Sequence, residues 1–260
     1  MSDAQMSSWK EGGVGWMIFD NPERHNAINI SMWGGLLDIL ADFASDPDVR
    51  ACVMTGAGDR AFVSGADIGE LPDRTRKLNV SGEGGGVPGR ALEALGVFPK
   101  PLIAMVRGWC LGGGVAVALK ADFRIAARDI QVGVPAARLG VGYPLDAVRD
   151  LVALVGPATA KLMLFTAQRM GAETALRVGF VDEVVAPDAL EERVRALTSE
   201  ICRNAPLSIF AAKAAVDHIV REASGADSPE RLIRACLSSA DFQEGRAAFL
   251  EKRQPVFQGR

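Results

Sequence analysis

The amino-acid sequence predicts an α/β fold that ends in a mostly helical C-terminal part. Up to about Leu145, short apolar segments of strand length alternate with helical segments, which indicates helices packed on sheets. Beyond Leu145, most apolar residues recur at the three- and four-residue steps of amphipathic helices. The chain has 260 residues, 48% hydrophobic and 23% charged, so it is long enough to bury a sizeable core.

The predicted strands are short apolar runs bounded by glycine, proline or polar residues. They cover residues 14–19, 51–55, 102–106, 123–127 and 181–185. The predicted helices follow the 3.6-residue period. They cover residues 29–43, 91–97, 115–121, 148–155, 158–166, 172–178, 190–203, 211–222 and 229–249. The glycine- and arginine-rich stretch 72–89 is either a surface loop or a lid over a ligand.

Charge and composition argue against several classes of protein. The net charge is −3, whereas a nucleic-acid-binding domain is typically basic. None of the four cysteines stands in a C-x-x-C pair and the two histidines are far apart, so we expect neither a metal site nor a disulfide framework. The apolar runs are too short to span a membrane, and the N-terminus lacks the apolar core of a signal peptide. We therefore expect a cytoplasmic protein with no nucleic-acid or membrane partner.

Three glycines, Gly112 to Gly114, open a predicted helix directly after a strand-like segment. A dinucleotide-binding G-x-G-x-x-G turn is one interpretation, but Val117 occupies its last glycine position, although Asp129 is near the expected acidic position. A tight turn with close packing is a second. A third is an anion-binding turn, whose unpaired backbone amides stabilise an oxygen that becomes negative during a reaction. This motif alone leaves all three open.

A second glycine motif favours the third interpretation. Residues 64–71 (SGADIGEL) also pass from a strand through a glycine into a helix start, and expose the Ala66 amide in the same way. Two such amides that converge on one point form an oxyanion hole. A dinucleotide site has no use for this second segment.

Three motifs now stand in order, each after a strand: residues 21–27 (NPERHNA), 64–71 (SGADIGEL) and 108–114 (GWCLGGG). The sequence resembles the crotonase (enoyl-CoA hydratase/isomerase) superfamily from about Val14 to residues 249–257, which is nearly the whole chain. The resemblance implies a spiral of ββα units with two near-perpendicular sheets. It also implies a core domain over residues 1–200 and a helical region over residues 201–260 for oligomerisation and active-site closure. Such proteins form homotrimers, often paired into hexamers.

The same resemblance implies an acyl-CoA substrate and no further cofactor. The thioester carbonyl accepts hydrogen bonds from two backbone amides, which the motif match assigns to Ala66 and Gly113, and an enolate forms. Removing one such donor typically slows a reaction by about a hundredfold or more.

The resemblance also assigns residues that bind coenzyme A. Arg24 approaches the nucleotide phosphates, which a guanidinium binds with two hydrogen bonds. The segment around Ala27 and the main chains of Ala66 and Ile68 line the adenine and pantetheine. Lys252 reaches coenzyme A, across a subunit boundary. For Arg24 and Lys252, a solvated surface charge is the alternative.

The chain departs from the family pattern at the two catalytic glutamates of the hydratases. The resemblance places them at Ala116 and Ala136, and alanine can neither donate nor accept a proton. Acid–base help typically contributes about 10²–10⁴-fold per group, so we expect inefficient hydration.

Two nearby residues are candidate catalytic groups. Tyr143 lies in a context similar to that of a tyrosine in decarboxylating crotonases of the methylmalonyl-CoA type, although those carry a histidine where this chain has Ala66. Asp146 is near the position where some isomerases keep an acid. Each also has a structural interpretation: Tyr143 closes a turn, and Asp146 caps a helix that begins at Ala147.

Together these features predict an enzyme of the enoyl-CoA hydratase/isomerase family, a lyase or isomerase that stabilises a thioester enolate. Decarboxylation or isomerisation with Tyr143 or Asp146 is one alternative to hydration. A protein that binds acyl-CoA without turning it over is another.

Overall fold

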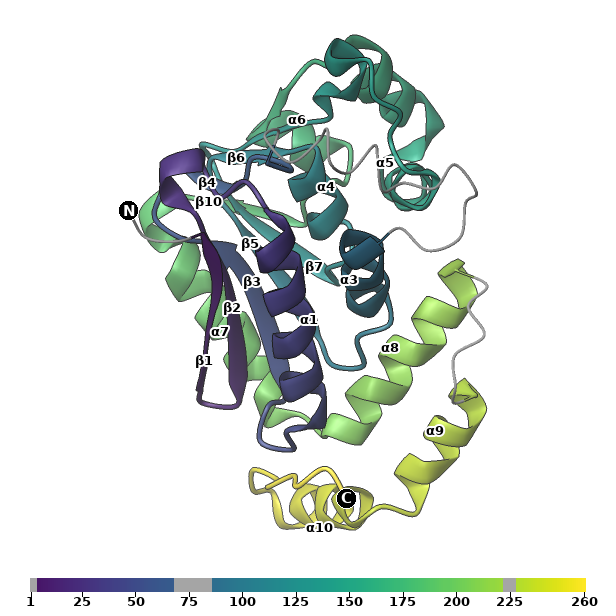
Figure 1. Cartoon of the computed structure of the whole chain (residues 1–260). Helices are drawn as coiled ribbons and strands as arrows, with labels where there is room; N and C mark the ends of the chain where they lie inside the picture. Colours follow the sequence, from purple (N-terminus) through teal and green to yellow (C-terminus); the bar gives the residue numbers. More distant parts are fainter. Residues whose placement is uncertain (1–3, 68–85, 222–227) are drawn as a thin grey trace.

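Two β-sheets form the scaffold of the protein (Figure 1). The structure is a computed structural model that describes residues 4–67, 86–221 and 228–260. The larger sheet has, in spatial order, β1 (Gln5–Glu11), β2 (Val14–Asp20), β3 (Ala51–Gly56), β5 (Leu102–Val106), β7 (Phe123–Ala127) and β10 (Glu183–Val185). The smaller sheet has β4 (Ala61–Val63), β6 (Trp109–Leu111), β8 (Gln131–Gly133) and β9 (Met170–Gly171).

The chain alternates between the two sheets. It contributes β3, β5 and β7 to the larger sheet, and each of these is followed by a strand of the smaller one, β4, β6 and β8. The helices that come next in the described chain are α3 (Gly86–Gly96), α4 (Gly113–Ala118) and, after the short 3₁₀ helix η3 (Pro135–Leu139), α5 (Leu145–Thr166). This succession is the spiral of ββα units that the sequence predicts.

Helices cover both faces of the larger sheet, which explains why its central strands are mostly apolar and almost entirely buried. Helix α1 (Ile30–Ser45) begins where the Asn29 side chain accepts a hydrogen bond from the Met32 amide. Its buried stripe, which includes Leu36 and Phe43, packs on one face. Leu190 and Val194 of α7 (Leu190–Arg203) pack on the other face. Figure 1 shows α1 in front of the strands and α7 behind them.

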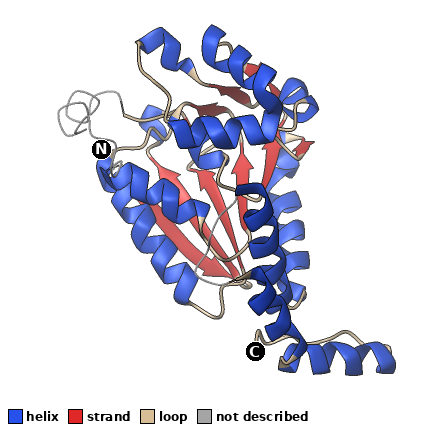
Figure 2. Ribbon diagram, turned by 90° about the vertical axis from the view of Figure 1, so that its right-hand side faces the viewer, coloured by secondary structure: helices blue, strands red, loops and turns tan. Residues whose placement is uncertain are grey.

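The last three helices extend away from the sheets. They are α8 (Pro206–Arg221), α9 (Pro229–Leu237) and α10 (Ala240–Glu251). Lys213 on α8 forms a 2.6 Å ion pair with Asp122, which follows α4 and precedes β7. Figures 1 and 2 show α9 and α10 at the end of the molecule that lies away from α4. Apolar side chains on these helices are exposed, among them Ile219, Leu237 and Phe249.

The structure corrects several predicted boundaries. The single helix predicted over 229–249 is two helices, because the Ser239 side chain accepts a hydrogen bond from the Phe242 amide and starts α10. The predicted helix 115–121 is α4, which begins two residues earlier at Gly113. The strands β1, β8 and β9 were missed, whereas the predicted break between residues 155 and 158 is present at Gly156, whose φ is +76°. In the described ranges, no helix combines the length and apolar character needed to cross a membrane.

Candidate active site

The parallel pairing of β4 with β6 brings two of the sequence motifs together. Both strands end at the same edge of the smaller sheet, and each continues into a glycine turn. A Cβ atom added to Gly113 would lie 3.3 Å from the Ala66 nitrogen. The two turns predicted to form an oxyanion hole are therefore in direct contact.

The amides of Ala66 and Gly113 are available for a ligand. Neither N–H group has an acceptor among the residues that the structure describes. The groups around Ala66 are paired: the Ile28 amide donates to the Gly65 carbonyl at 2.9 Å, and the Asp67 amide donates to the Ile28 carbonyl at 3.0 Å. The pairing on either side fixes the direction of the Ala66 N–H group.

Two positions in these turns require glycine, each for its own reason. Gly65 has φ +128°, a conformation that residues with a side chain rarely adopt. Gly114 has an ordinary conformation, but a Cβ atom there would lie 2.1 Å from the Val63 carbonyl oxygen. The close-packing interpretation of the three glycines therefore holds for Gly114, whereas Gly113 carries one of the two amides without acceptors.

The first motif forms a buried turn held by two asparagines. The Asn26 side-chain nitrogen donates to the carbonyls of Ala57 (3.0 Å) and Ala61 (2.8 Å), and its oxygen accepts from the Asn21 amide at 3.0 Å. The Asn21 side chain in turn donates to the Ala27 carbonyl at 2.9 Å. These bonds fix the segment that the resemblance assigns to coenzyme A binding.

The first and second motifs lie against each other. The Ser64 amide donates to the His25 carbonyl at 3.0 Å, and the Ser64 hydroxyl donates to the Arg24 carbonyl at 3.1 Å. The Arg24 guanidinium forms a 2.6 Å ion pair with Asp67, and 64% of its side chain is exposed. Arg24 therefore stands at the surface, beside the turn that carries the Ala66 amide.

The other predicted coenzyme A residues lie in different places. Ala27 is buried in the turn of the first motif. Ile68 and most of the stretch 72–89 lie outside the described residues. Lys252 caps the C-terminus of α10 with φ +55° and is exposed. Figure 1 shows α10 at the lower end of the molecule and α4 in its upper half, with the sheets between them, so the structure does not bring Lys252 to the amides of its own chain.

Tyr143 reaches the glycine turn, and Asp146 does not. The Tyr143 hydroxyl donates a 2.9 Å hydrogen bond to the Gly112 carbonyl. Burial raises the pKa of this phenol, and the nearby Cys110 and Asp150 raise it further, so the group is a neutral donor at physiological pH. Asp146 is exposed in the first turn of α5 and pairs with Arg149 at 3.1 Å. It makes no cap bond to the start of that helix, which contradicts its predicted capping role.

The two positions that the resemblance assigns to the hydratase glutamates carry methyl groups. Ala116 is buried within α4, and Ala136 is partly buried in η3, against the main hydrophobic core. Two carboxylates discussed above could take the place of those acids, but each is held in an ion pair. Asp67 pairs with Arg24, and Asp150 pairs with Lys120 at 2.5 Å.

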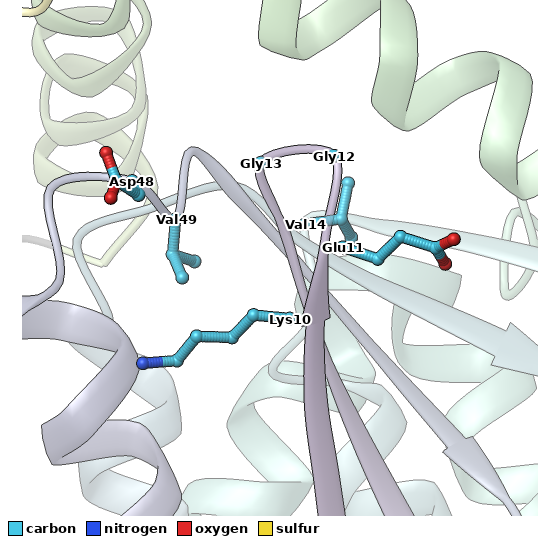
Figure 3. Close-up of a pocket in the computed structure, with 7 residues that line it drawn as sticks. All are labelled: Lys10, Glu11, Gly12, Gly13, Val14, Asp48 and Val49. Carbon is cyan, nitrogen blue, oxygen red and sulfur yellow. The ribbon is translucent and has the colours of Figure 1, made fainter.

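Two surface hollows lie apart from these turns. One is at the tip of the β1–β2 hairpin, and Figure 3 shows the residues that line it. They are Lys10, Glu11, Gly12, Gly13, Val14, Asp48 and Val49. The other lies beside Arg107 and includes Asp129, which the dinucleotide interpretation requires as its acidic residue. Neither hollow is lined by a residue of the three motifs, and no cluster of His, Cys, Asp or Glu suited to a metal ion occurs in the described ranges.

Comparison with known proteins identifies the family. The family model for enoyl-CoA hydratase/isomerase matches residues 10–260. The short-chain-enoyl-CoA hydratase of Clostridium acetobutylicum is 32% identical over 252 residues, which are 94% of each chain. The carnitinyl-CoA dehydratase of Escherichia coli K12 is 35% identical over 266 residues, which cover 96% of this chain and 97% of that one.

The fold agrees with that assignment. The crystal structure of an enoyl-CoA hydratase/isomerase family protein from Hyphomonas neptunium superposes with a TM-score of 0.90 at 31% identity, over 98% of both chains. The two sheets and the C-terminal helices are thus parts of one known architecture. The chain is an enzyme of the enoyl-CoA hydratase/isomerase, or crotonase, family.

Proposed function

We propose that this protein binds an acyl-CoA and stabilises its thioester enolate between the amides of Ala66 and Gly113, in a reaction other than efficient hydration. The observation that carries the proposal is that two amides without acceptors among the described residues lie next to each other, where β4 and β6 end. A thioester carbonyl placed between them accepts two hydrogen bonds. Because the donors are fixed in advance, they strengthen as charge builds on the oxygen, at no cost of reorganisation.

The side chains around these amides favour decarboxylation among the enolate-forming reactions. Hydration needs a group that ionises water, and Ala116 and Ala136 cannot do so. Isomerisation needs a base that moves a proton, whereas Asp146 is exposed and paired with Arg149. Loss of carbon dioxide needs no base, because the electron pair of the breaking carbon–carbon bond itself forms the enolate. Isomerisation with Asp146, and binding without turnover, are the alternatives.

Coenzyme A binds across the first and second motifs. Arg24 is exposed and held by Asp67, so its guanidinium can turn to the nucleotide phosphates without losing its anchor. Ala27 and the main chain of Ile68 line the adenine and pantetheine. Lys252 acts from a second subunit, because its own α10 lies far from the motifs (Figure 1).

The C-terminal helices form the contacts of a homotrimer or of a hexamer of two trimers. Helices α8 to α10 expose an unusual number of large apolar side chains for a surface. They include Val216, Ile219, Val220, Ile233, Leu237, Phe242, Phe249 and Leu250. We expect sedimentation equilibrium to give three or six times the mass of one chain at micromolar concentration. A mass of one chain would contradict this assembly and the role of Lys252.

Thioester binding tests the oxyanion hole directly. Titration calorimetry with butyryl-CoA and with free coenzyme A should show tighter binding of the thioester, because only the thioester reaches the two amides. Gly113→Ala places a methyl group 3.3 Å from the Ala66 nitrogen. That methyl group obstructs the hydrogen bond from the Ala66 N–H to the thioester. We therefore expect this variant to fold and to bind butyryl-CoA about 2- to 10-fold more weakly, which is the value of one hydrogen bond. Its affinity for free coenzyme A should stay the same.

Gly114→Ala is the matched control for that variant. Its methyl group meets the Val63 carbonyl at 2.1 Å, so the backbone must shift, and we expect the free energy of unfolding to fall by about 1–3 kcal/mol or more. Equal affinity of the unmodified protein for both ligands would rule out the oxyanion hole. Unfolding of Gly113→Ala would assign that glycine to packing as well.

The missing acids predict slow hydration. We expect crotonyl-CoA to be hydrated at least about 10²–10⁴-fold more slowly than by a hydratase with both glutamates. Ala116→Glu combined with Ala136→Glu should raise this rate. Each single change should do much less, because two acids on one water act as a unit. The gain should depend on pH, since two close buried carboxyls raise at least one pKa. Brisk hydration by the unmodified protein would overturn the argument.

The reaction itself is identified with a panel of three substrate types. Malonyl-CoA and methylmalonyl-CoA report decarboxylation, 3-hexenoyl-CoA reports isomerisation and crotonyl-CoA reports hydration. Mass spectrometry of the products should find that the carboxylated substrates lose carbon dioxide fastest. Faster migration of the double bond would favour isomerisation with Asp146. Tight binding of all ligands with no product would establish a binding protein.

A further inference from the structure

The two proposed oxyanion donors differ in what holds their peptide groups. The C=O of one residue and the N–H of the next belong to one planar unit. The Gly113 N–H therefore moves with the Gly112 C=O, and the Ala66 N–H moves with the Gly65 C=O. What binds each carbonyl decides where the opposite N–H points.

Both carbonyls accept hydrogen bonds, but from different kinds of donor. The Gly65 carbonyl accepts from the Ile28 backbone amide at 2.9 Å. The Gly112 carbonyl accepts from the Ala116 amide at 3.1 Å and from the Tyr143 hydroxyl at 2.9 Å. Among the residues that the structure describes, a side chain therefore holds only the second peptide, and that side chain comes from a segment 31 residues further along the chain.

The Gly112–Gly113 peptide needs this additional anchor. It lies between two glycines, which restrict rotation of a peptide less than any other residues, and Gly112 has φ +50° and ψ −107°. A rotation of this peptide would turn the Gly113 N–H away from the Ala66 N–H. A hydrogen bond to its carbonyl opposes that rotation.

The same bond also strengthens the donor. A hydrogen bond to a carbonyl oxygen polarises the peptide and makes its N–H a better donor, by about 10–30% in condensed-phase estimates. Helix α4 has only six residues, so the summed dipole of a long helix is not there to supply this polarisation.

We propose that Tyr143 is a positioning residue that orients and polarises the Gly112–Gly113 peptide, so that the Gly113 amide stabilises the enolate oxygen. This role rests on the proposed oxyanion hole. Tyr143 acts on the reaction through the peptide, because its proton is donated to the Gly112 carbonyl. The raised pKa of the phenol keeps that proton in place.

Infrared spectroscopy of a bound thioester measures the effect. Butyryl-CoA labelled with ¹³C at the thioester carbonyl has no double bond to hydrate and no carboxylate to lose. Hydrogen bonds from the two amides lower its carbonyl stretching frequency when it binds. In Tyr143→Phe the contribution of the Gly113 amide should fall by about 10–30%, so we expect the total shift, to which both amides contribute, to be smaller by at least about 5–15%.

Turnover of the substrate preferred in the panel gives a second readout. One oxyanion donor is worth about 10²–10³-fold, and a 10–30% weakening of that contribution corresponds to about a 2- to 8-fold loss of kcat. We expect KM to change little. Thr55→Val is the matched control, because it removes a buried hydroxyl that donates to the Met105 carbonyl at 3.1 Å, outside the site. It should leave the shift and kcat unchanged.

The chain offers a variant that works in the opposite direction. Tyr143 is its only tyrosine, so growth on 3-fluorotyrosine modifies this one position. The fluorinated phenol is more acidic and donates a stronger hydrogen bond, so we expect a larger carbonyl shift. This measurement keeps the proposal testable if Tyr143→Phe does not fold.

The outcomes separate the two proposals. A shift that is the same in the unmodified, Phe and fluorotyrosine proteins overturns the role of Tyr143 and leaves the oxyanion hole intact. A loss of kcat above about a hundredfold with an unchanged shift also overturns it, and shows that Tyr143 acts on the substrate directly. No shift in the unmodified protein refutes the oxyanion hole itself.

Discussion

The parallel pairing of β4 with β6 is the constraint on which the site depends. Because both strands run in the same direction, the turns that follow them leave the sheet at the same edge, and Ala66 and Gly113 meet. No side chain of these two residues takes part in the proposed chemistry. The larger sheet with its two apolar faces, covered by α1 and α7, serves to hold these short strands in register.

The order of the motifs predicted that the turns at Ala66 and Gly113 lie together, whereas the hydrogen bonds that hold these turns could not be predicted from the sequence. Residues 14–19 and 51–55 are mostly apolar and carry no charge, so these strands were evident, as was the break before Pro157. Strand β1 was missed because it is an edge strand whose serine, lysine and glutamate side chains hide the alternating pattern. The division between α9 and α10 was missed because Ser239 reads as an ordinary helix residue until its cap bond is seen.

The hydrogen bonds that hold the turns connect residues far apart in the chain, and a local pattern carries no trace of them. Asn26 spans 35 residues to the Ala61 carbonyl, and Tyr143 spans 31 residues to that of Gly112. Sequence reasoning named Tyr143 as a candidate group on the substrate. The observed partner of its hydroxyl is the Gly112 carbonyl, which suits a role in orienting a peptide better than a role in proton transfer.

Backbone donors and side-chain acids differ in how easily a sequence can lose them. A single substitution removes a glutamate side chain completely, but every residue other than proline keeps its N–H. An oxyanion hole made of peptide groups therefore persists while the acid–base chemistry around it changes. A substitution can still change the group that donates a hydrogen bond to the carbonyl of each of these peptides. On the Gly65 side that donor is a backbone amide, so the Gly112 side, with Tyr143, is where a side chain can adjust the strength of the hole.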